Sequence, residues 1–304
     1  MFFSKDYKND DGIFVLDQFD KTTKEVASFY QNNPFPNYDR TDDKFSINKK
    51  GANNILAKKV KELVGLNKNI LEVGSGTCQL SNFFAIGTNN TVFALDPTIE
   101  SLKVGKKFAQ ENLIRNVHFV NGSIFDEVFN REIFDLVWCS GVLHHTKDPY
   151  TGFQNCVNYL KKDGFIVIGL YNRYGRLRTY IRKIIYKLFG KKVIMKIDPI
   201  LRKFKDSPEA VESWILDQYT HPVESTHTIE EVLDWFDKNN IKVVSTMPNI
   251  TDLNIAELEK LHSLPTQPKV NISNTEILLT QLNMIFNSYG SDGGLYVLVG
   301  KKRG

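Results

Sequence analysis

The stretch ILEVGSGTCQLSNFFA, residues 70–85, decides the fold class of this chain. Its apolar beginning predicts a buried strand, its two glycines predict a tight turn, and LSNFFA predicts a helix. A second apolar run, TVFALD, follows at residues 91–96 and predicts another strand that ends on an acidic residue. Strands joined by a helical crossover lie parallel in one sheet, so the stretch predicts a β-α-β unit with a glycine turn after its first strand.

The alternation of strands and helices continues along the chain. Further elements are expected at IESLKVGKKFAQENL (helix, 99–113), VHFV (strand, 117–120), FDLVWCSG (strand, 134–141), about 150–161 (helix), GFIVIGLYN (strand, 164–172), TIEEVLDWFDKNN (helix, 228–240), IKVVSTMP (strand, 241–248) and GLYVLVGKK (strand, 294–302). This order predicts an α/β fold: a Rossmann-like doubly wound sheet with parallel strands, an antiparallel last strand and helices on both faces.

Two blocks interrupt this alternation. Residues 173–226 and 251–288 are expected to be helical cap insertions over the carboxyl ends of the strands, where open α/β sheets bind ligands. The core is then formed by residues 51–172, 227–250 and 289–304, and residues 1–50 precede it as an N-terminal lid segment.

Composition and charge restrict the class of protein. The 304 residues are 41% hydrophobic, which is enough for a large buried core. No run approaches the ~18 apolar residues of a membrane span, and charges interrupt the N-terminus, so a cytoplasmic location is expected. The net charge of +4 is mild, so any important basic character must be local. Cys78, Cys139 and Cys156 are too widely spaced for a zinc motif, and we expect buried free thiols with no metal and no disulfide.

The residues after the glycine turn separate three ligand classes that use such a junction, namely P-loop phosphates, dinucleotides and S-adenosylmethionine. A P-loop needs Lys and then Ser or Thr after the second glycine, but Thr77, Cys78 and Gln79 stand there, which excludes it. The dinucleotide pattern is weak because Gln79 takes the place of its third glycine. What remains is acidic-x-Gly-x-Gly. Asp96 could accept both ribose hydroxyls, and Glu72 suits the cationic amino end of an amino-acid ligand.

Four motifs in order make residues 69–172 resemble the class I S-adenosylmethionine-dependent methyltransferases: LEVGSGTCQLS, ALDPT, NGSIFD and FDLVWCSGVLHHTKDP. The resemblance implies S-adenosyl-L-methionine as cofactor, bound by Glu72, Gly74, Gly76, Asp96, Pro97, Ser123, Ile124 and Ser140. Two positions depart from the family pattern. Cys78 replaces a common third glycine. Ser123 replaces a common aspartate that contacts the adenine, so its hydroxyl or the backbone of Ile124 would supply that contact.

The flanking segments FYQNNPFPNYDR, LYNRYGRLRT and DQYTHPVESTHTIEEVLDWF resemble a bacterial subgroup of these enzymes. The resemblance implies that N-terminal aromatic residues fold over the cofactor, although packing alone would also explain them. The residues expected in the lid or against the substrate are Tyr30, Phe35, Tyr38, Tyr171, Arg173, Tyr219 and His221. The resemblance therefore indicates the cofactor and leaves the acceptor open.

Two adjacent histidines follow the fourth strand of the resembling core. His144 and His145 could simply cap that loop, or one of them could face the site and take a proton from an acceptor hydroxyl or amine. His145 is the stronger candidate. Methyl transfer from a sulfonium depends more on alignment of the reacting atoms than on a base, so a catalytic role remains one of two interpretations.

The segment NRYGRLRTYIRKIIYKLFGKKVIMK combines a basic face, between residues 173 and 192, with apolar residues at helical spacing. Three interpretations fit it. It could be a cap helix that packs its apolar stripe on the core, an interfacial helix on anionic lipid, or a phosphate-binding surface for RNA. The RNA interpretation is the least favoured, because no known RNA-binding module accompanies the segment.

A group of polar residues in DQYTHPVESTHT could hold a metal: Asp217, His221, Glu224 and His227. Their spacing fits no helical zinc motif, and Thr228 is expected to be the N-cap of the next helix. Contacts with a polar substrate are therefore favoured over a metal site.

Together these observations predict methyl transfer to an oxygen or nitrogen of a small or amphipathic acceptor. The alternatives are an RNA methyltransferase that uses the basic face and a non-catalytic module that binds the cofactor and a partner. Nucleic acid is disfavoured, peripheral membrane contact is an open expectation, and one sequence does not give the oligomeric state.

Overall fold

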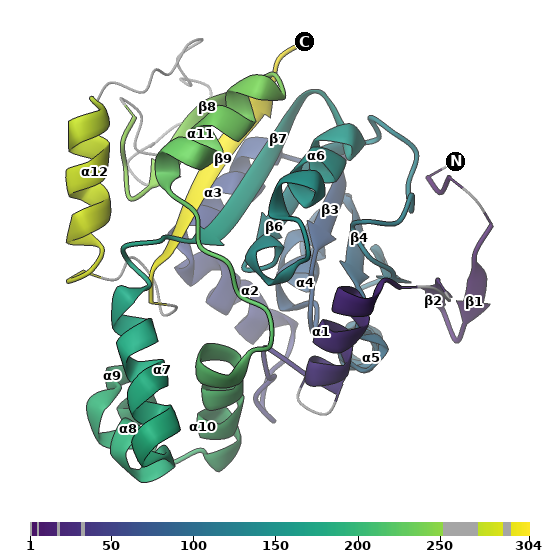
Figure 1. Ribbon diagram of the computed structural model, residues 1–304. Coiled ribbons are helices and arrows are strands. Elements are labelled where there is room, and N and C mark those ends of the chain that lie inside the picture. Colours follow the sequence, from purple (N-terminus) through teal and green to yellow (C-terminus); the bar gives the residue numbers. More distant parts are fainter. Residues whose placement is uncertain (1, 5, 17–18, 32–33, 252–272, 288–292) are drawn as a thin grey trace.

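The computed structural model describes residues 1–304 except 1, 5, 17–18, 32–33, 252–272 and 288–292. Within the described residues, one nine-stranded sheet runs in the order β1-β2-β5-β4-β3-β6-β7-β9-β8 (Figure 1). The strands are β1 (Lys8–Asp10), β2 (Ile13–Val15), β3 (Asn69–Val73), β4 (Thr91–Asp96), β5 (Val117–Asn121), β6 (Phe134–Ser140), β7 (Leu160–Tyr171), β8 (Ile241–Met247) and β9 (Leu295–Lys302).

The central strands confirm the predicted parallel sheet. β3 pairs in parallel with β4 and β6, and the pairs β4–β5 and β6–β7 are also parallel. β9 lies between β7 and β8 and is antiparallel to both, which confirms the predicted antiparallel last strand. Because the parallel strands end at one edge, the residues that follow them meet there, as open α/β sheets require for a binding site.

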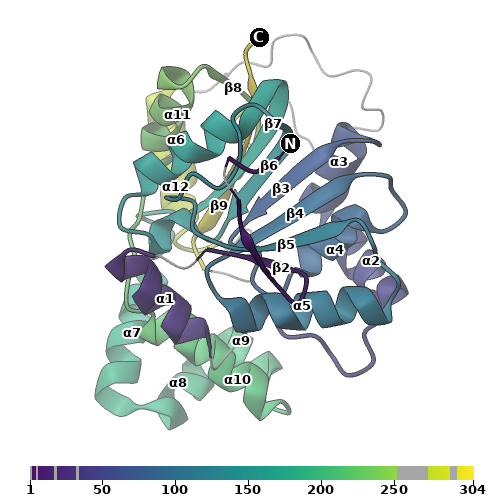
Figure 2. The same ribbon diagram turned by 90° about the vertical axis from the view of Figure 1, so that its right-hand side faces the viewer.

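Helices cover both faces of the sheet (Figure 2). On one face lie α2 (Lys44–Asn53), α3 (Ile55–Val64), α4 (Gln79–Ala85) and α5 (Ile99–Glu111), and on the other lie α6 (Pro149–Tyr159) and α11 (Ile229–Lys238). Each layer buries its own apolar cluster, for example Ala57 and Phe84 on the first face and Phe153 and Phe236 on the second. The Thr228 side chain accepts from the Glu231 amide, which confirms the predicted N-cap of α11.

The N-terminal segment extends the sheet at one edge. β1 and β2 form an antiparallel pair, and β2 adds to β5 in parallel at the edge. The sequence pattern does not predict these strands, because each has only three residues. Helix α1 (Lys21–Gln31) follows and has no buried residue, so it lies on the outside of the fold.

The first insertion forms a separate helical lobe beyond the carboxyl ends of the strands (Figure 1). It contains α7 (Leu177–Phe189), α8 (Lys191–Ile197), α9 (Pro199–Lys203), α10 (Pro208–Ile215) and a π-helical turn (Leu216–Thr220), and we call residues 177–220 the cap lobe. Its small core surrounds the buried Asp198, which accepts hydrogen bonds from Trp214 Nε1 at 2.9 Å and from the Tyr219 hydroxyl. The predicted helical character of this insertion is confirmed.

The second predicted insertion, 251–288, lies partly outside the described residues. Its described part holds α12 (Asn274–Asn283), which packs against α11. The buried Gln281 joins the two by accepting from the Asn172 side chain and the Ile229 amide, both at 2.8 Å. Among the helices that the structure describes, none has the length and apolar content needed to cross a membrane.

Candidate functional site

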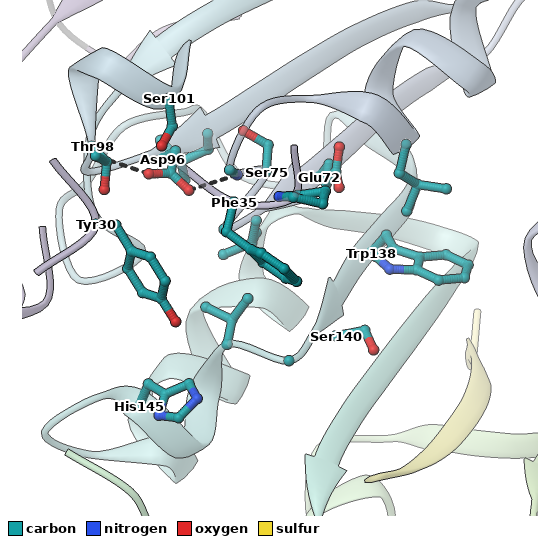
Figure 3. Close-up of a pocket in the computed structure, with 18 of the residues that line it drawn as sticks. Tyr30, Phe35, Glu72, Ser75, Asp96, Thr98, Ser101, Trp138, Ser140 and His145 are labelled. Carbon is teal, nitrogen blue, oxygen red and sulfur yellow. Dashed lines mark hydrogen bonds between the residues drawn. The ribbon is translucent and has the colours of Figure 1, made fainter. Parts of the chain in front are cut away.

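A cavity of about 480 Å³ opens at the carboxyl ends of the parallel strands (Figure 3). It is lined by all eight residues predicted to bind the cofactor: Glu72, Gly74, Gly76, Asp96, Pro97, Ser123, Ile124 and Ser140. Four residues predicted to act on or cover the substrate also line it: Tyr30, Phe35, Tyr171 and His145. The fold therefore brings together most of the predicted site, while the role of each side chain stays a prediction.

The two glycines of the turn lie against other segments of the chain as well as against the cavity. Gly74 and Gly76 have positive φ values of 67° and 51°, which glycine adopts without strain. A Cβ at Gly74 would lie 2.3 Å from Val142, and one at Gly76 would lie 2.1 Å from the Phe35 carbonyl oxygen. Cys78 is also left-handed, with φ 61°, which explains why a third glycine is common at this position. Glycine here thus permits the close approach of two segments of this chain.

Asp96 ends β4 with its carboxylate held by two backbone donors. The Thr98 amide donates to Oδ1 at 2.7 Å and the Gly76 amide donates to Oδ2 at 2.8 Å (Figure 3). Burial raises the pKa of Asp96 above its ordinary value, and these donors partly offset the shift. A carboxylate has about four acceptor positions, so both oxygens can accept a further hydrogen bond from a ligand hydroxyl.

Glu72 lies at the other end of the glycine turn and is almost fully buried, with 6% of its surface exposed. Burial raises its pKa to about 8, although the hydrogen bond that the Ser81 hydroxyl donates to the carboxylate lowers the pKa. The carboxyl is therefore mainly protonated at neutral pH until a cation approaches. A positively charged ligand group beside it would favour the ionised form.

Ser123, at the predicted adenine side, is fixed by its neighbours. Its amide donates to Asp126 Oδ2 at 3.0 Å, and its hydroxyl lies 3.5 Å from the Thr23 hydroxyl of α1. Asp126, three residues on, binds the backbone of this loop. The Ser123 hydroxyl and Thr23 thus give the cavity neutral polar groups at this position.

His145 lies on the opposite side of the cavity from Asp96 (Figure 3). Its Nδ1 is 2.6 Å from the Val223 carbonyl oxygen, which can only accept, so Nδ1 carries the proton and Nε2 is the acceptor nitrogen. Burial lowers the pKa of His145. The ring is therefore neutral at physiological pH, as a proton acceptor must be.

Asp217 forms a further part of this side and comes from the π-helical turn of the cap lobe. It accepts from the Tyr30 hydroxyl and from Gln218 Nε2, both at 2.7 Å. Gln218 also donates to the Tyr171 hydroxyl at 3.1 Å. We call Tyr30, His145, Tyr171 and Asp217 the acceptor wall, because all four line the cavity and the Asp217–Gln218 pair links Tyr30 to Tyr171.

A buried cation supports the acceptor wall from behind. Arg176 is fully buried, pairs with Glu224 at 2.8 Å, and lies with its guanidinium 3.7 Å from the Tyr171 ring centre. Burial opposes the charge of Arg176, but Tyr171 and Glu224 raise its pKa overall. Arg176 therefore belongs to a structural network and does not contribute to an exposed basic face, contrary to its place in the predicted phosphate-binding surface.

Five predicted site residues do not line the cavity. His144 packs its ring 3.9 Å from that of Tyr171, and His221 stacks behind His145 at 3.7 Å. Tyr38 donates to the Thr77 carbonyl at 3.0 Å behind the glycine turn. Arg173 is exposed on the surface. Tyr219 belongs to the cap-lobe core. These residues can influence a ligand in this cavity only through their neighbours.

The four residues considered as a metal set take different partners. Asp217 binds Tyr30, His221 stacks on His145, Glu224 pairs with Arg176, and His227 Nδ1 lies 2.9 Å from Glu231. Cys78, Cys139 and Cys156 are buried free thiols.

Several cavity residues were not predicted: Thr22, Thr23, Val26, Ile47, Lys50, Gly51, Thr98, Ser101 and Trp138. The residues of α1 and α2 carry no motif, so their position follows only from how these helices pack. Thr98 could have been predicted, because it lies just beyond the carboxyl end of a parallel strand, as Asp96 does.

The sequence is similar to a known domain family and to individual known proteins. Residues 71–168 match a family model described as a methyltransferase domain. A ubiquinone biosynthesis O-methyltransferase from Actinobacillus pleuropneumoniae serotype 5b is 28% identical over 212 residues, which are 68% of this chain and 74% of the relative. One from Haemophilus ducreyi is 31% identical over 137 residues, 43% of this chain and 55% of the relative. The match thus spans about half the length of the second relative.

Solved structures resemble the whole fold at low identity. Geranyl diphosphate C-methyltransferase from Streptomyces coelicolor A3(2), in complex with S-adenosyl-L-homocysteine, has a TM-score of 0.51 and 14% identity, covering 93% of this chain and 98% of its own. Magnesium protoporphyrin IX methyltransferase from Synechocystis PCC 6803, with bound SAH, has a TM-score of 0.53 and 10% identity, covering 93% and 100%. At such identities the likeness concerns the fold.

Proposed function

Because this chain is a class I S-adenosylmethionine-dependent methyltransferase, we propose that it methylates a hydroxyl oxygen of an amphipathic acceptor. The observation that carries the proposal is that His145 lines the cavity, with its tautomer set by the Val223 carbonyl so that Nε2 can accept a proton. The names of the curated relatives, which are O-methyltransferases, support oxygen over nitrogen.

The cavity residues fit S-adenosylmethionine, which supplies a methyl group activated by a positively charged sulfur. Asp96 would accept from the ribose hydroxyls, since both carboxylate oxygens retain acceptor capacity. Glu72 would bind the ammonium of the amino-acid end and ionise beside it. Ser123 and the Ile124 backbone would contact the adenine, and Ser140 would line the amino-acid end.

His145 would accept the proton that the acceptor hydroxyl loses. Its neutral ring and its fixed Nε2 lone pair suit that task without any rearrangement. His221 stacks on the ring at 3.7 Å and limits its rotation. A positioned base of this kind typically contributes about 10²–10⁴ in rate, the rest coming from alignment and exclusion of water.

Asp217 would orient the acceptor from the other side of the same wall. Its two oxygens already accept from Tyr30 and Gln218, which fixes the carboxylate while leaving acceptor capacity on each oxygen. An acceptor with two neighbouring hydrogen-bond donors, such as a dihydroxylated ring, could donate to Asp217 and His145 together. The apolar lining from Val26, Phe35 and Phe125 would contact its hydrocarbon part.

The test is a turnover assay that measures S-adenosylhomocysteine release with matched acceptor pairs, a long-chain catechol and the corresponding long-chain aminobenzene. We expect turnover of the catechol, with mass spectrometry showing one added methyl on oxygen. His145→Gln should lose turnover while retaining affinity for S-adenosylhomocysteine. Methylation of the amine alone, or of bulk RNA alone, would contradict the proposal. Tight cofactor binding without methylation of any acceptor class would favour the non-catalytic module.

A further inference from the structure

Helix α7 exposes a row of large apolar side chains. Leu177, Ile181, Ile184 and Leu188 are 46%, 51%, 59% and 68% exposed, and we call these four the α7 stripe. Their spacing of four, three and four residues places them on one face of the helix. Phe189, 64% exposed, follows directly. The structure therefore does not support the interpretation in which this stripe packs against the core.

The opposite face of α7 already holds the cap lobe together. Thr179 is buried, Arg182 lies 3.8 Å from the central Asp198, and the Tyr186 ring stacks on that of Tyr219 at 5.7 Å between centres. The lobe thus has its own core without the α7 stripe. An exposed apolar face that the fold does not need indicates a contact with something else.

Positive charge is concentrated around the stripe. Residues 173–206 include twelve Lys or Arg, of which Arg176 is buried and paired with Glu224, and only two Asp, whereas the whole chain carries a net charge of +4. Four lysines on α7 and α8 are exposed: Lys187, Lys191, Lys192 and Lys196. Of these, Lys191 pairs with Glu212 at 2.8 Å. The partner of this surface must therefore accept apolar side chains and carry negative charge.

We propose that the α7 stripe and its surrounding lysines dock on the surface of an anionic lipid bilayer. A helix that lies in the interface buries its apolar face among the acyl chains and places its cations near the lipid phosphates. A second copy of this surface would bring like charges together. RNA would bind the lysines but would leave the apolar residues in water. A bilayer satisfies both features at once.

The docking surface belongs to the same lobe as Asp217, one of the four residues of the acceptor wall. The chain passes from α7 through α8, α9 and α10 to the π-helical turn that carries Asp217 (Figure 1). The docking inference does not depend on the proposed O-methylation. If both hold, an amphipathic acceptor would reach the cavity from the membrane to which the lobe is bound.

The test is flotation of the full chain with vesicles at physiological salt. We expect binding to vesicles of phosphatidylglycerol and phosphatidylcholine, and little binding to phosphatidylcholine alone. Ile184→Ser with Leu188→Ser should weaken binding at least about tenfold, since interfacial affinity scales with buried apolar area. The matched control is Phe45→Ser with Leu66→Ser, two residues that are 72% and 57% exposed elsewhere. Unchanged S-adenosylhomocysteine affinity would show that each variant is folded.

Four results would overturn the inference. The wild-type chain could fail to float with any vesicle, or it could bind neutral and anionic vesicles equally well. The variant with Ile184→Ser and Leu188→Ser could bind as well as the wild type, or sedimentation could show a dimer that forms through α7 and does not bind lipid. Steep salt-dependent binding of bulk RNA that the serine variant retains, with no vesicle binding, would assign the lysines to RNA instead. Failure of the O-methylation assay would leave the flotation result intact, so the two proposals can fail separately.

Discussion

Replacing Glu72 with Gln should stabilise the fold in a pH-dependent way. The native carboxyl has a pKa of about 8, whereas the ordinary value is 4.5, because it is buried at the glycine turn. The raised pKa means that the folded chain holds this proton more tightly than the unfolded chain does. Below pH 4.5 both states are protonated, and Glu72 imposes no penalty. As the pH rises from 4.5 towards 8, only the unfolded state ionises, so the free energy of unfolding falls.

The size of the effect follows from the same two values. Each pH unit in this window lowers the free energy of unfolding by about 1.4 kcal/mol, so the penalty at pH 7 is on the order of 3 kcal/mol. Gln removes the titration, and its amide oxygen can still accept from Ser81. Glu72→Gln should therefore match the wild type near pH 4.5 and exceed its stability at pH 7 by up to this amount.

Urea unfolding followed by circular dichroism at pH 4.5, 6, 7 and 8 would measure the difference. Glu111→Gln provides the control, because its side chain is 62% exposed and belongs to an ordinary surface pair. A stability difference between Glu72→Gln and the wild type that stays constant from pH 4.5 to 8 would refute the reasoning. It would mean that the native carboxyl ionises as it does in the unfolded chain.

Three further predictions concern the cofactor, the base and the cap lobe. Asp96→Ala should weaken S-adenosylhomocysteine binding by about 1.5–3 kcal/mol in calorimetric titration, because hydrogen bonds to a charged group are lost; unchanged affinity would exclude the ribose contact. His145→Gln should lower kcat about 10²-fold with little change in that affinity. Because burial lowers the pKa of His145, wild-type activity should persist as the pH falls below 6.5. Asp198→Ala should leave Trp214 and Tyr219 without their acceptor, at a cost of about 1–3 kcal/mol each. Faster hydrogen exchange confined to the cap lobe would demonstrate this local loss, whereas exchange at the wild-type rate would contradict it.

The sheet was predictable because its strands carry local signals. Apolar runs such as TVFALD and FDLVWCSG end at the edge of the sheet, where Asp96 and Ser140 line the cavity. The short strand β2 gives no such signal, because three residues are too few for a pattern. It pairs with β5, whose partner residues lie more than 100 positions along the chain. Only the folded sheet edge determines that pairing.

Tyr30 and Asp217 show why the acceptor side was less accessible to prediction. Tyr30 was predicted as part of a lid, and Asp217 was considered as one of four polar residues that could hold a metal or, as favoured, contact a polar substrate. The two side chains meet at 2.7 Å although 187 positions separate them. Their contact requires α1, the strand ends and the cap lobe to be in place together. No periodicity or spacing within either segment encodes that contact.

The same contact suggests how the cavity is closed. Helix α1 has no buried residue, yet Tyr30 is bonded to Asp217 and Phe29 packs its ring 5.1 Å from that of His221. Behind the glycine turn, the Thr77 amide donates to the Phe35 carbonyl at 3.2 Å. The N-terminal segment is therefore joined to the cap lobe on one side and to the cofactor turn on the other. A ligand that displaces either contact would affect both walls of the cavity, so the affinities for cofactor and acceptor should be coupled through this segment.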